Sequence, residues 1–193
     1  EMALVAIDPR TGYIKALVGG ISFEGSEFNR VTQSKRQPGS SFKPYVYTAA
    51  LELGVSPGFI IEDAPITFEV PSDIWNPDGK WEPKNFDQKF RGNVTLRMAI
   101  ESSLNVPSVK LLDKIGVQAA INTAQKMGIK SELRRNLGLT LGVSEITLFE
   151  HTSAFGTLAN SGVRVEPTAI LRVEDRDGTL IEKHVVRETR ALD

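Results

Sequence analysis

The sequence predicts an α+β fold, because β-rich segments lie near both ends of the chain and helical patterns lie between them. Runs rich in β-branched residues occupy 3–7 and 13–18, and two more occupy 169–173 and 179–182. From about residue 95 to 160, apolar residues recur at helical spacing. We therefore expect a central antiparallel sheet built from the two ends of the chain and an all-helical lobe over about 95–160.

Each expected strand pair is joined by a turn sequence. Asp8–Gly12 places proline and glycine between the first two strands, which predicts a hairpin. Asp175–Gly178 separates the last two strands and ends in Asp-Gly, a pair that tolerates positive φ. Residues 19–38 are polar and lack a hydrophobic period, so we expect a loop there.

The first helix is expected over 39–53, with Gly54 closing it. Residues 55–93 are rich in proline, which predicts a long irregular excursion with one short strand at 66–70. The excursion carries two tryptophans, which either line a cleft or anchor it to the core; they are Trp75 and Trp81.

Four further helices are expected between residues 95 and 160. The first follows an N-cap at Thr95, and the second begins at Pro107. The third runs over 116–127 and ends at a glycine, and the fourth runs over 144–160, where Ser144 begins a cap-like sequence.

Bulk properties exclude several classes of function. The chain of 193 residues is 40% hydrophobic, enough for one or at most two domains. Its 23 basic and 24 acidic residues give no field that would attract nucleic acid or anionic lipid. Cysteine is absent, which excludes thiol catalysis and Cys-zinc sites. His151 and His184 have no metal-ligand partner at close spacing, so we predict no metal site and no cofactor.

The segment 40–43, Ser-Ser-Phe-Lys, is the first candidate site. At a helix start Ser40 and Lys43 share one side, and a lysine of lowered pKa can take the proton that makes a serine hydroxyl nucleophilic. The alternative is a serine N-cap followed by a surface lysine. The preceding Pro38-Gly39 turn, and Pro44 in the first helical turn, favour the catalytic interpretation.

Ser103 and Asn105 form the second candidate site. Two residues apart on a loop between helices, the hydroxyl could relay a proton and the amide could hold a peptide backbone. The alternative is a helix C-terminus capped by Asn105.

Three blocks of sequence together resemble the penicillin-binding proteins; they are 28–44, 81–107 and 139–162. Within that group they are similar to the high-molecular-mass, bifunctional class A type, which polymerises and cross-links peptidoglycan. Serine–lysine, serine–asparagine and lysine–threonine–glycine motifs mark these proteins and the serine β-lactamases. The resemblance implies a penicillin-binding/serine β-lactamase-like fold over 1–193, incomplete at its C-terminus.

The resemblance also implies a role for each candidate residue. Ser40 would be the nucleophile that attacks the D-alanyl-D-alanine amide of a stem peptide, with Lys43 as its general base. Ser103 would be the proton relay, and Asn105 would bind the substrate backbone. Peptidoglycan stem peptides would be the substrates, and β-lactams would trap Ser40 as a stable ester.

One motif of the family is missing, because the sequence contains no Lys-Thr-Gly or Lys-Ser-Gly. Lys126-Met127-Gly128 begins and ends with the right residues, but lysine and glycine are both favoured where a helix ends, so capping explains them. We expect that the motif lies on a segment beyond residue 193 or on a second polypeptide. Removing an oxyanion donor slows acyl transfer, so we expect slow acylation of these 193 residues alone.

The remaining implications concern the whole protein. We expect a D,D-transpeptidase at the outer face of a bacterial cytoplasmic membrane, with an upstream glycosyltransferase domain and an anchor outside this sequence. Neither a signal peptide nor a run of about 18 apolar residues occurs in it. A D,D-carboxypeptidase with the same residues, and a non-catalytic β-lactam sensor or scaffold, are the alternatives.

Overall fold

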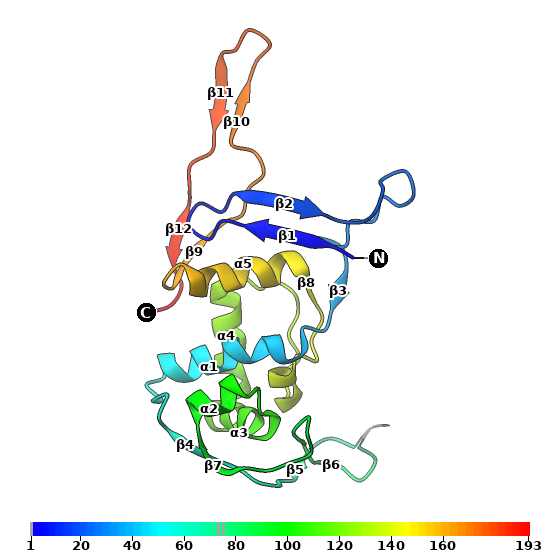
Figure 1. The fold of residues 1–193 in the computed structure, drawn as a ribbon, viewed down its shortest axis with the longest axis vertical. Coiled ribbons are helices and arrows are strands. Elements are labelled where there is room, and N and C mark those ends of the chain that lie inside the picture. Colours follow the sequence, from blue (N-terminus) through cyan, green and yellow to red (C-terminus); the bar gives the residue numbers. More distant parts are fainter. Residues whose placement is uncertain (1, 73, 75) are drawn as a thin grey trace. The chain divides into compact units, whose positions relative to one another are not determined.

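A computed structural model describes residues 2–72, 74 and 76–193 (Figure 1). The chain forms two compact units. The first contains Glu1–Gln37, Asn122–Glu132 and Ser144–Asp193, and the second contains Pro38–Ile121 and Leu133–Val143. Strands and helices both occur, as the predicted α+β class requires.

The first unit begins with the expected hairpin. Strand β1 (Leu4–Ile7) pairs antiparallel with β2 (Ile14–Val18). The turn needs glycine at position 12, where φ is +72° and a Cβ would lie 2.2 Å from the carbonyl oxygen of Glu166. Helix α5 (Leu148–Ala159) packs against β1 (Figure 1).

Helix α5 begins four residues later than the expected start at Ser144. Thr147 is its N-cap: its hydroxyl accepts from the Glu150 N–H, while the Glu150 carboxylate accepts from the Thr147 N–H. This is a capping box, which the sequence Thr-Leu-Phe-Glu encodes. The preceding residues are extended because β8 (Ile146–Thr147) pairs with β3 (Lys35–Arg36).

The C-terminal part of the first unit contains two more antiparallel pairs. Strands β10 (Arg172–Glu174) and β11 (Leu180–Lys183) form the expected hairpin around Asp-Gly. Strands β9 (Val163–Val165) and β12 (Glu188–Arg190) were not expected, because three-residue strands carry too short a pattern. A parallel bridge between Tyr13 and Thr168 joins an N-terminal segment to a C-terminal segment within this unit.

The second unit contains most of the helices. Its elements, with their bounds, are the 3₁₀-helix η1 (Gly39–Phe42), α1 (Lys43–Glu52), β4 (Ile60–Asp63), β5 (Phe68–Glu69), β6 (Lys80–Trp81), β7 (Gly92–Thr95), α2 (Leu96–Glu101), α3 (Asn105–Ile115) and the 3₁₀-helix η2 (Leu137–Leu141). Helix α4 (Val117–Met127) begins in this unit and continues into the first. Helix α1 contacts α2 and α3 (Figure 1). The units differ from the expected lobe over 95–160, since α1 joins α2 and α3 while α5 lies with β1.

Much of the segment 55–93 is irregular, as expected, and the strand expected at 66–70 is β5, but strands β4, β6 and β7 were not expected. Strand β4 lies in the proline-free interval between Pro57 and Pro65 and pairs antiparallel with β7, and β5 pairs with β6. Proline excludes only the residues around it, so short strands fit between prolines. The Trp81 ring packs against Phe68 across the β5–β6 pair, whereas Trp75 lies outside the described residues.

The helix starts in the second unit follow local rules in part. Thr95 caps α2 as expected, its hydroxyl accepting from the Met98 N–H at 3.1 Å. Helix α3 begins at Asn105, two residues before the expected Pro107. Proline fits the third helical position because the first N–H groups of a helix have no intrahelical partner.

The capping box of α5 gives a stability prediction with a definite pH dependence. Burial raises the pKa of Glu150, but hydrogen bonds from Ser131 and from the Thr147 and Lys130 N–H groups outweigh it and hold that pKa below its usual value. A depressed folded-state pKa contributes stability above the unfolded pKa, and this contribution disappears as pH falls through the folded one.

Glu150→Gln should therefore lower the free energy of unfolding by about 1 kcal/mol at neutral pH. In urea titrations the difference from wild type should shrink once the pH falls below the ordinary glutamate pKa of about 4.3. An unchanged difference down to about pH 3 would contradict the assignment.

Candidate active site

Ser40 lies in the 3₁₀-helix η1, and not in the first turn of an α-helix as expected. Gly39 before it has φ of +60°, a conformation that favours glycine. A 3₁₀-helix has three residues per turn, so residues i and i+3 eclipse one another. Ser40 and Lys43 therefore lie on one side of the segment, and Ser40 is exposed.

Lys43 is the first residue of α1 and is 1% exposed. Its Nζ donates to the Ser103 carbonyl oxygen at 2.6 Å, to Asn105 Oδ1 at 2.8 Å and to Ser103 Oγ at 3.0 Å. The two candidate sites, about 60 residues apart in sequence, are therefore brought together. The alternative of a surface lysine is wrong.

The lysine environment favours a base over a fixed cation. Burial lowers the pKa of Lys43 from 10.5 to about 8. Two of its partners, the Ser103 carbonyl and the Asn105 amide oxygen, can only accept, so they take two N–H groups. After loss of the third proton the amine has a lone pair, which can accept a proton from a serine hydroxyl.

Ser103 occupies a backbone position that usually belongs to glycine. Its φ is +50°. Its N–H donates to Ile100 O and the Leu104 N–H donates to Ala99 O, which is the pattern of a Schellman motif at the end of α2. A left-handed non-glycine residue is strained, and such strain is concentrated at functional sites. Glycine would adopt this conformation without strain, but only serine supplies the hydroxyl that contacts Lys43.

Asn105 is the first residue of α3, so the alternative of a helix C-cap is wrong. Its Oδ1 accepts from Lys43, and its Nδ2 donates to the Lys84 carbonyl oxygen at 2.9 Å. The donor-only lysine and the acceptor-only carbonyl fix which end of the amide faces which partner.

A buried hydrogen bond between two hydroxyl groups joins α1 to α3. Ser108 donates its single proton to Leu104 O at 2.6 Å. The 2.9 Å contact between Tyr47 and Ser108 therefore has the tyrosine as donor. Burial raises the pKa of Tyr47 to about 12, so the phenol keeps the proton that this bond requires.

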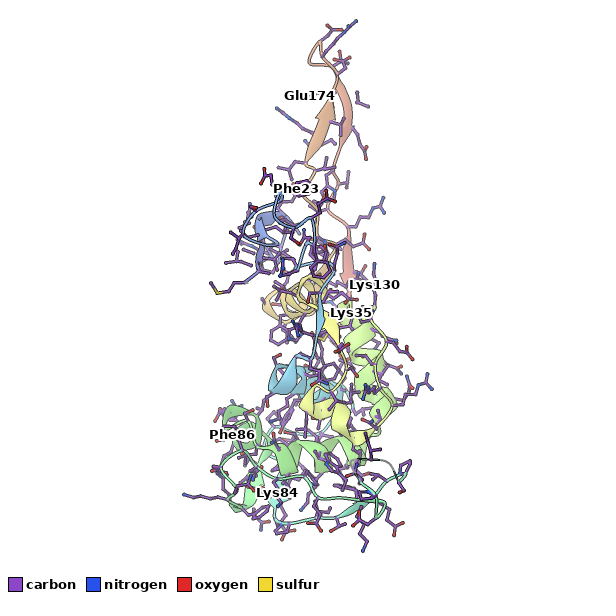
Figure 2. All side chains as sticks on the ribbon, turned by 90° about the vertical axis from the view of Figure 1, so that its right-hand side faces the viewer. Phe23, Lys35, Lys84, Phe86, Lys130 and Glu174 are labelled. Atoms are coloured by element: carbon purple, nitrogen blue, oxygen red, sulfur yellow. The ribbon has the colours of Figure 1, made fainter. Side chains whose placement is uncertain are left out.

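Sequence reasoning missed two residues that shape the site. Asn85 is 1% exposed and bonds to the start of α3. Its neighbours Lys84 and Phe86 lie at the surface (Figure 2). Gly142 follows η2 and has φ of +71°; a Cβ there would lie 2.2 Å from the carbonyl oxygen of Gly39. A glycine at position 142 could have indicated a left-handed backbone or a close approach, but nothing in the sequence identified Gly39 as the segment it approaches.

These side chains make up a serine–lysine site of the kind that performs acyl transfer: an exposed hydroxyl one turn before a buried amine, which bonds a second hydroxyl and an amide. The chain belongs to the penicillin-binding protein transpeptidase domain family, whose profile it matches over residues 2–191. The expected family and fold class are thereby confirmed.

Relatives of the chain are penicillin-binding proteins 1A. It is 43% identical to that of Pseudomonas aeruginosa over 182 residues, which are 94% of this chain and 22% of that protein. It is 42% identical to that of Neisseria gonorrhoeae over 180 residues, 92% of this chain and again 22% of the relative. The chain thus spans about a fifth of the length of the curated relatives it matches.

Solved structures show the same fold. The crystal structure of penicillin-binding protein 1A from Haemophilus influenzae matches with a TM-score of 0.88 and 32% identity, covering 96% of this chain and 27% of that one. The PonA1 protein of Mycobacterium tuberculosis in complex with penicillin V matches with a TM-score of 0.80 and 26% identity, covering 94% and 49%.

Gly142→Ala should destabilise the protein more than its backbone conformation alone explains. A left-handed alanine costs about 1–2 kcal/mol, and the collision with Gly39 adds to that cost. Gly54→Ala is the matched control, because Gly54 has φ of +82° and open space around its Cβ direction. Equal losses of unfolding free energy in denaturant titrations of the two variants would contradict the close packing of η1 on η2.

Proposed function

We propose that this chain carries the serine, lysine and serine–asparagine motifs of a peptidoglycan D,D-transpeptidase. Ser40 is the nucleophile, Lys43 the general base, Ser103 the proton relay and Asn105 a substrate-binding residue. The observation that carries the proposal is the buried Lys43 amine within hydrogen-bond distance of both Ser103 and Asn105, one 3₁₀ turn after Ser40.

In the acylation step, neutral Lys43 accepts the Ser40 hydroxyl proton as Ser40 Oγ attacks the carbonyl carbon between the two D-alanines. The tetrahedral intermediate collapses, and the carbon–nitrogen bond breaks. The proton on Lys43 passes through the Ser103 hydroxyl, 3.0 Å away, to the departing amine of D-alanine. The product is an ester on Ser40.

In the second step the amine of another stem peptide attacks this ester. Its proton leaves by the same route in reverse, and Ser40 regains its hydroxyl hydrogen as the new amide forms. With a β-lactam the broken amide belongs to a ring, so the leaving nitrogen stays attached and the ester persists. β-Lactams are therefore proposed as covalent inhibitors.

Our proposal for the whole protein places this domain outside the bacterial cytoplasmic membrane, with an anchor and a glycosyltransferase domain elsewhere in the polypeptide. The similarity to proteins 1A supports it. Among the described residues, no helix is both long and apolar enough to cross a bilayer. No nucleic-acid partner and no cofactor enter the proposal.

Ser40→Ala should abolish covalent labelling by benzylpenicillin, measured by mass spectrometry of the intact protein and its peptides. Ser41→Ala is the matched control in the same turn; its hydroxyl bonds to Pro38 O, and labelling should persist. A label that survives Ser40→Ala would refute the proposed nucleophile.

Acceptor dependence separates the possible reactions. With a D-Ala-D-Ala peptide and an added acceptor amine, a transpeptidase gives the cross-linked amide. A carboxypeptidase gives only the shortened acid, and a sensor releases no D-alanine. Either of the last two outcomes would overturn the proposed reaction while leaving the nucleophile assignment in place.

Acylation by a fluorescent penicillin should speed up as pH rises toward 8. The neutral amine is the base, and its fraction grows until the pH passes the Lys43 pKa of about 8. The logarithm of the second-order rate constant should rise by about one per pH unit below that value and level off above it. A flat profile from about pH 6 to about pH 9 would exclude Lys43 as the base.

The missing Lys-Thr-Gly motif predicts slow acylation of these 193 residues as an isolated polypeptide. Loss of one oxyanion donor costs about 10²–10³ in rate. Stopped-flow labelling of the isolated polypeptide should be slower by about that factor than labelling of a polypeptide that also contains the motif. Equal rates would contradict the prediction.

A further inference from the structure

The start of α3 is capped by a residue from a distant loop. Leu104, which precedes the helix, makes no side-chain cap. Instead Asn85 Oδ1 accepts from the Asn105 N–H at 2.9 Å and from the Val106 N–H at 3.1 Å. These are two of the first N–H groups that a helix leaves without intrahelical partners.

The buried Asp63 decides which way the Asn85 amide points. Asp63 is 0% exposed and accepts from Asn85 Nδ2 at 2.8 and 3.0 Å and from the Arg91 N–H at 3.0 Å. A carboxylate accepts and an amide NH₂ donates, so Asn85 must turn its NH₂ to Asp63 and its oxygen to α3. The same NH₂ also donates to Lys89 O at 2.8 Å.

Every hydrogen-bonding position of the Asn85 amide is thus in use. The oxygen accepts twice, from α3, and the NH₂ donates to Asp63 and to the Lys89 carbonyl. A fully satisfied buried amide holds its partners in one geometry, and a flipped amide would place donors against donors. The bonds of Asn85 therefore stabilise the start of α3 and also fix its position.

The residue that Asn85 caps is also the residue that binds the lysine. Asn105 offers its N–H to Asn85 and its Oδ1 to Lys43. The segment 84–85 holds Asn105 at a second point, since Asn105 Nδ2 donates to Lys84 O. A continuous series of polar contacts therefore runs from Asp63 through Asn85 and Asn105 to Lys43.

We propose that Asn85, oriented by Asp63, is a positioning residue for Lys43: it fixes the first turn of α3 so that Asn105 Oδ1 and Ser103 meet the lysine amine. The proposal rests on the acyl-transfer function proposed above. Asn85 touches neither Ser40 nor the substrate in this assignment. It acts through Asn105, and displacement of reacting groups by about 1 Å costs on the order of 10²-fold in rate.

Asn85→Ala should lower the first-order rate constant for acylation by a fluorescent penicillin on the order of 10- to 100-fold. The constant for the preceding binding step should change little. Stopped-flow titration over β-lactam concentration separates the two constants. The measurement is made on the purified protein at a temperature where melting curves show the variant folded. An acylation step within about twofold of wild type would reduce Asn85 to a structural role and overturn the proposal.

Thr95→Ala is the matched control. It removes the N-cap of α2 in the same unit; none of the three atoms that accept from Lys43 Nζ lies within α2, and the bonds that hold Ser103 are at the opposite end of that helix. It should lower the melting temperature and leave the acylation rate constant of the folded protein near the wild-type value. If Thr95→Ala slowed acylation as much as Asn85→Ala, general destabilisation would explain both results.

An exchange of the two side chains tests the orientation argument. Asn85→Asp sets two buried carboxylates against each other, and Asp63→Asn removes the acceptor-only group that orients Asn85, so each should slow acylation. The double variant Asp63→Asn/Asn85→Asp again pairs one donor with one acceptor at these two positions, and its carboxylate can still accept from α3. It loses the Asn85 bond to the Lys89 carbonyl, so only part of the wild-type rate should return. It should acylate faster than Asn85→Asp. A double variant no faster than the slower single variant would overturn the proposed orientation.

The failure of this proposal and that of the proposed function are distinguishable. If the wild-type protein is not acylated at Ser40, the acyl-transfer function fails. If the wild type is acylated normally and Asn85→Ala is also, the function stands and the positioning role fails.

Discussion

The burial of one lysine amine is the constraint on which the rest of the site depends. Lys43 is 1% exposed, and an uncompensated buried charge or amine is costly. The protein satisfies it with three oxygens from the junction of α2 and α3. That requirement fixes where α1 must lie relative to this junction, and the Tyr47–Ser108 bond keeps the two helices in that relation. The same burial lowers the pKa of Lys43, as the proposed role of general base requires.

The polar contacts around the lysine have a consistent direction. Asp63 only accepts, Lys43 only donates when protonated, and the amides of Asn85 and Asn105 lie between them with one orientation each. The backbone N–H groups at the start of α3 are part of the same series, so the cap of this helix also determines where Asn105 lies. We therefore expect a change at Asp63, which lies in β4, to alter the position of the groups that bind the Lys43 amine.

Three left-handed residues surround the site and show how tightly its backbone is determined. Gly142 packs against the backbone of Gly39, where a Cβ on Gly142 would not fit, whereas a Cβ on Gly39 would meet nothing within 4 Å. Ser103 holds a similar conformation without the freedom of glycine. Such positions persist only where the surrounding structure fixes them, here the Schellman motif and the contacts of the neighbouring helices.

The sequence by itself determined the features that depend on neighbours along the chain: the hairpin at Gly12, the cap at Thr95, and the placement of Ser40 and Lys43 three residues apart. Such features arise from backbone dihedrals and from bonds within one turn, which a short pattern encodes. The short strand β4 was missed because its hydrogen bonds go to β7, about thirty residues away. Only the tertiary structure decided that Lys43 is buried, that Ser103 and Asn105 meet it, that Asn85 bonds the start of α3 and that Gly142 packs against Gly39. Those facts depend on residues far apart in sequence, and no local pattern records which distant group will satisfy a buried donor.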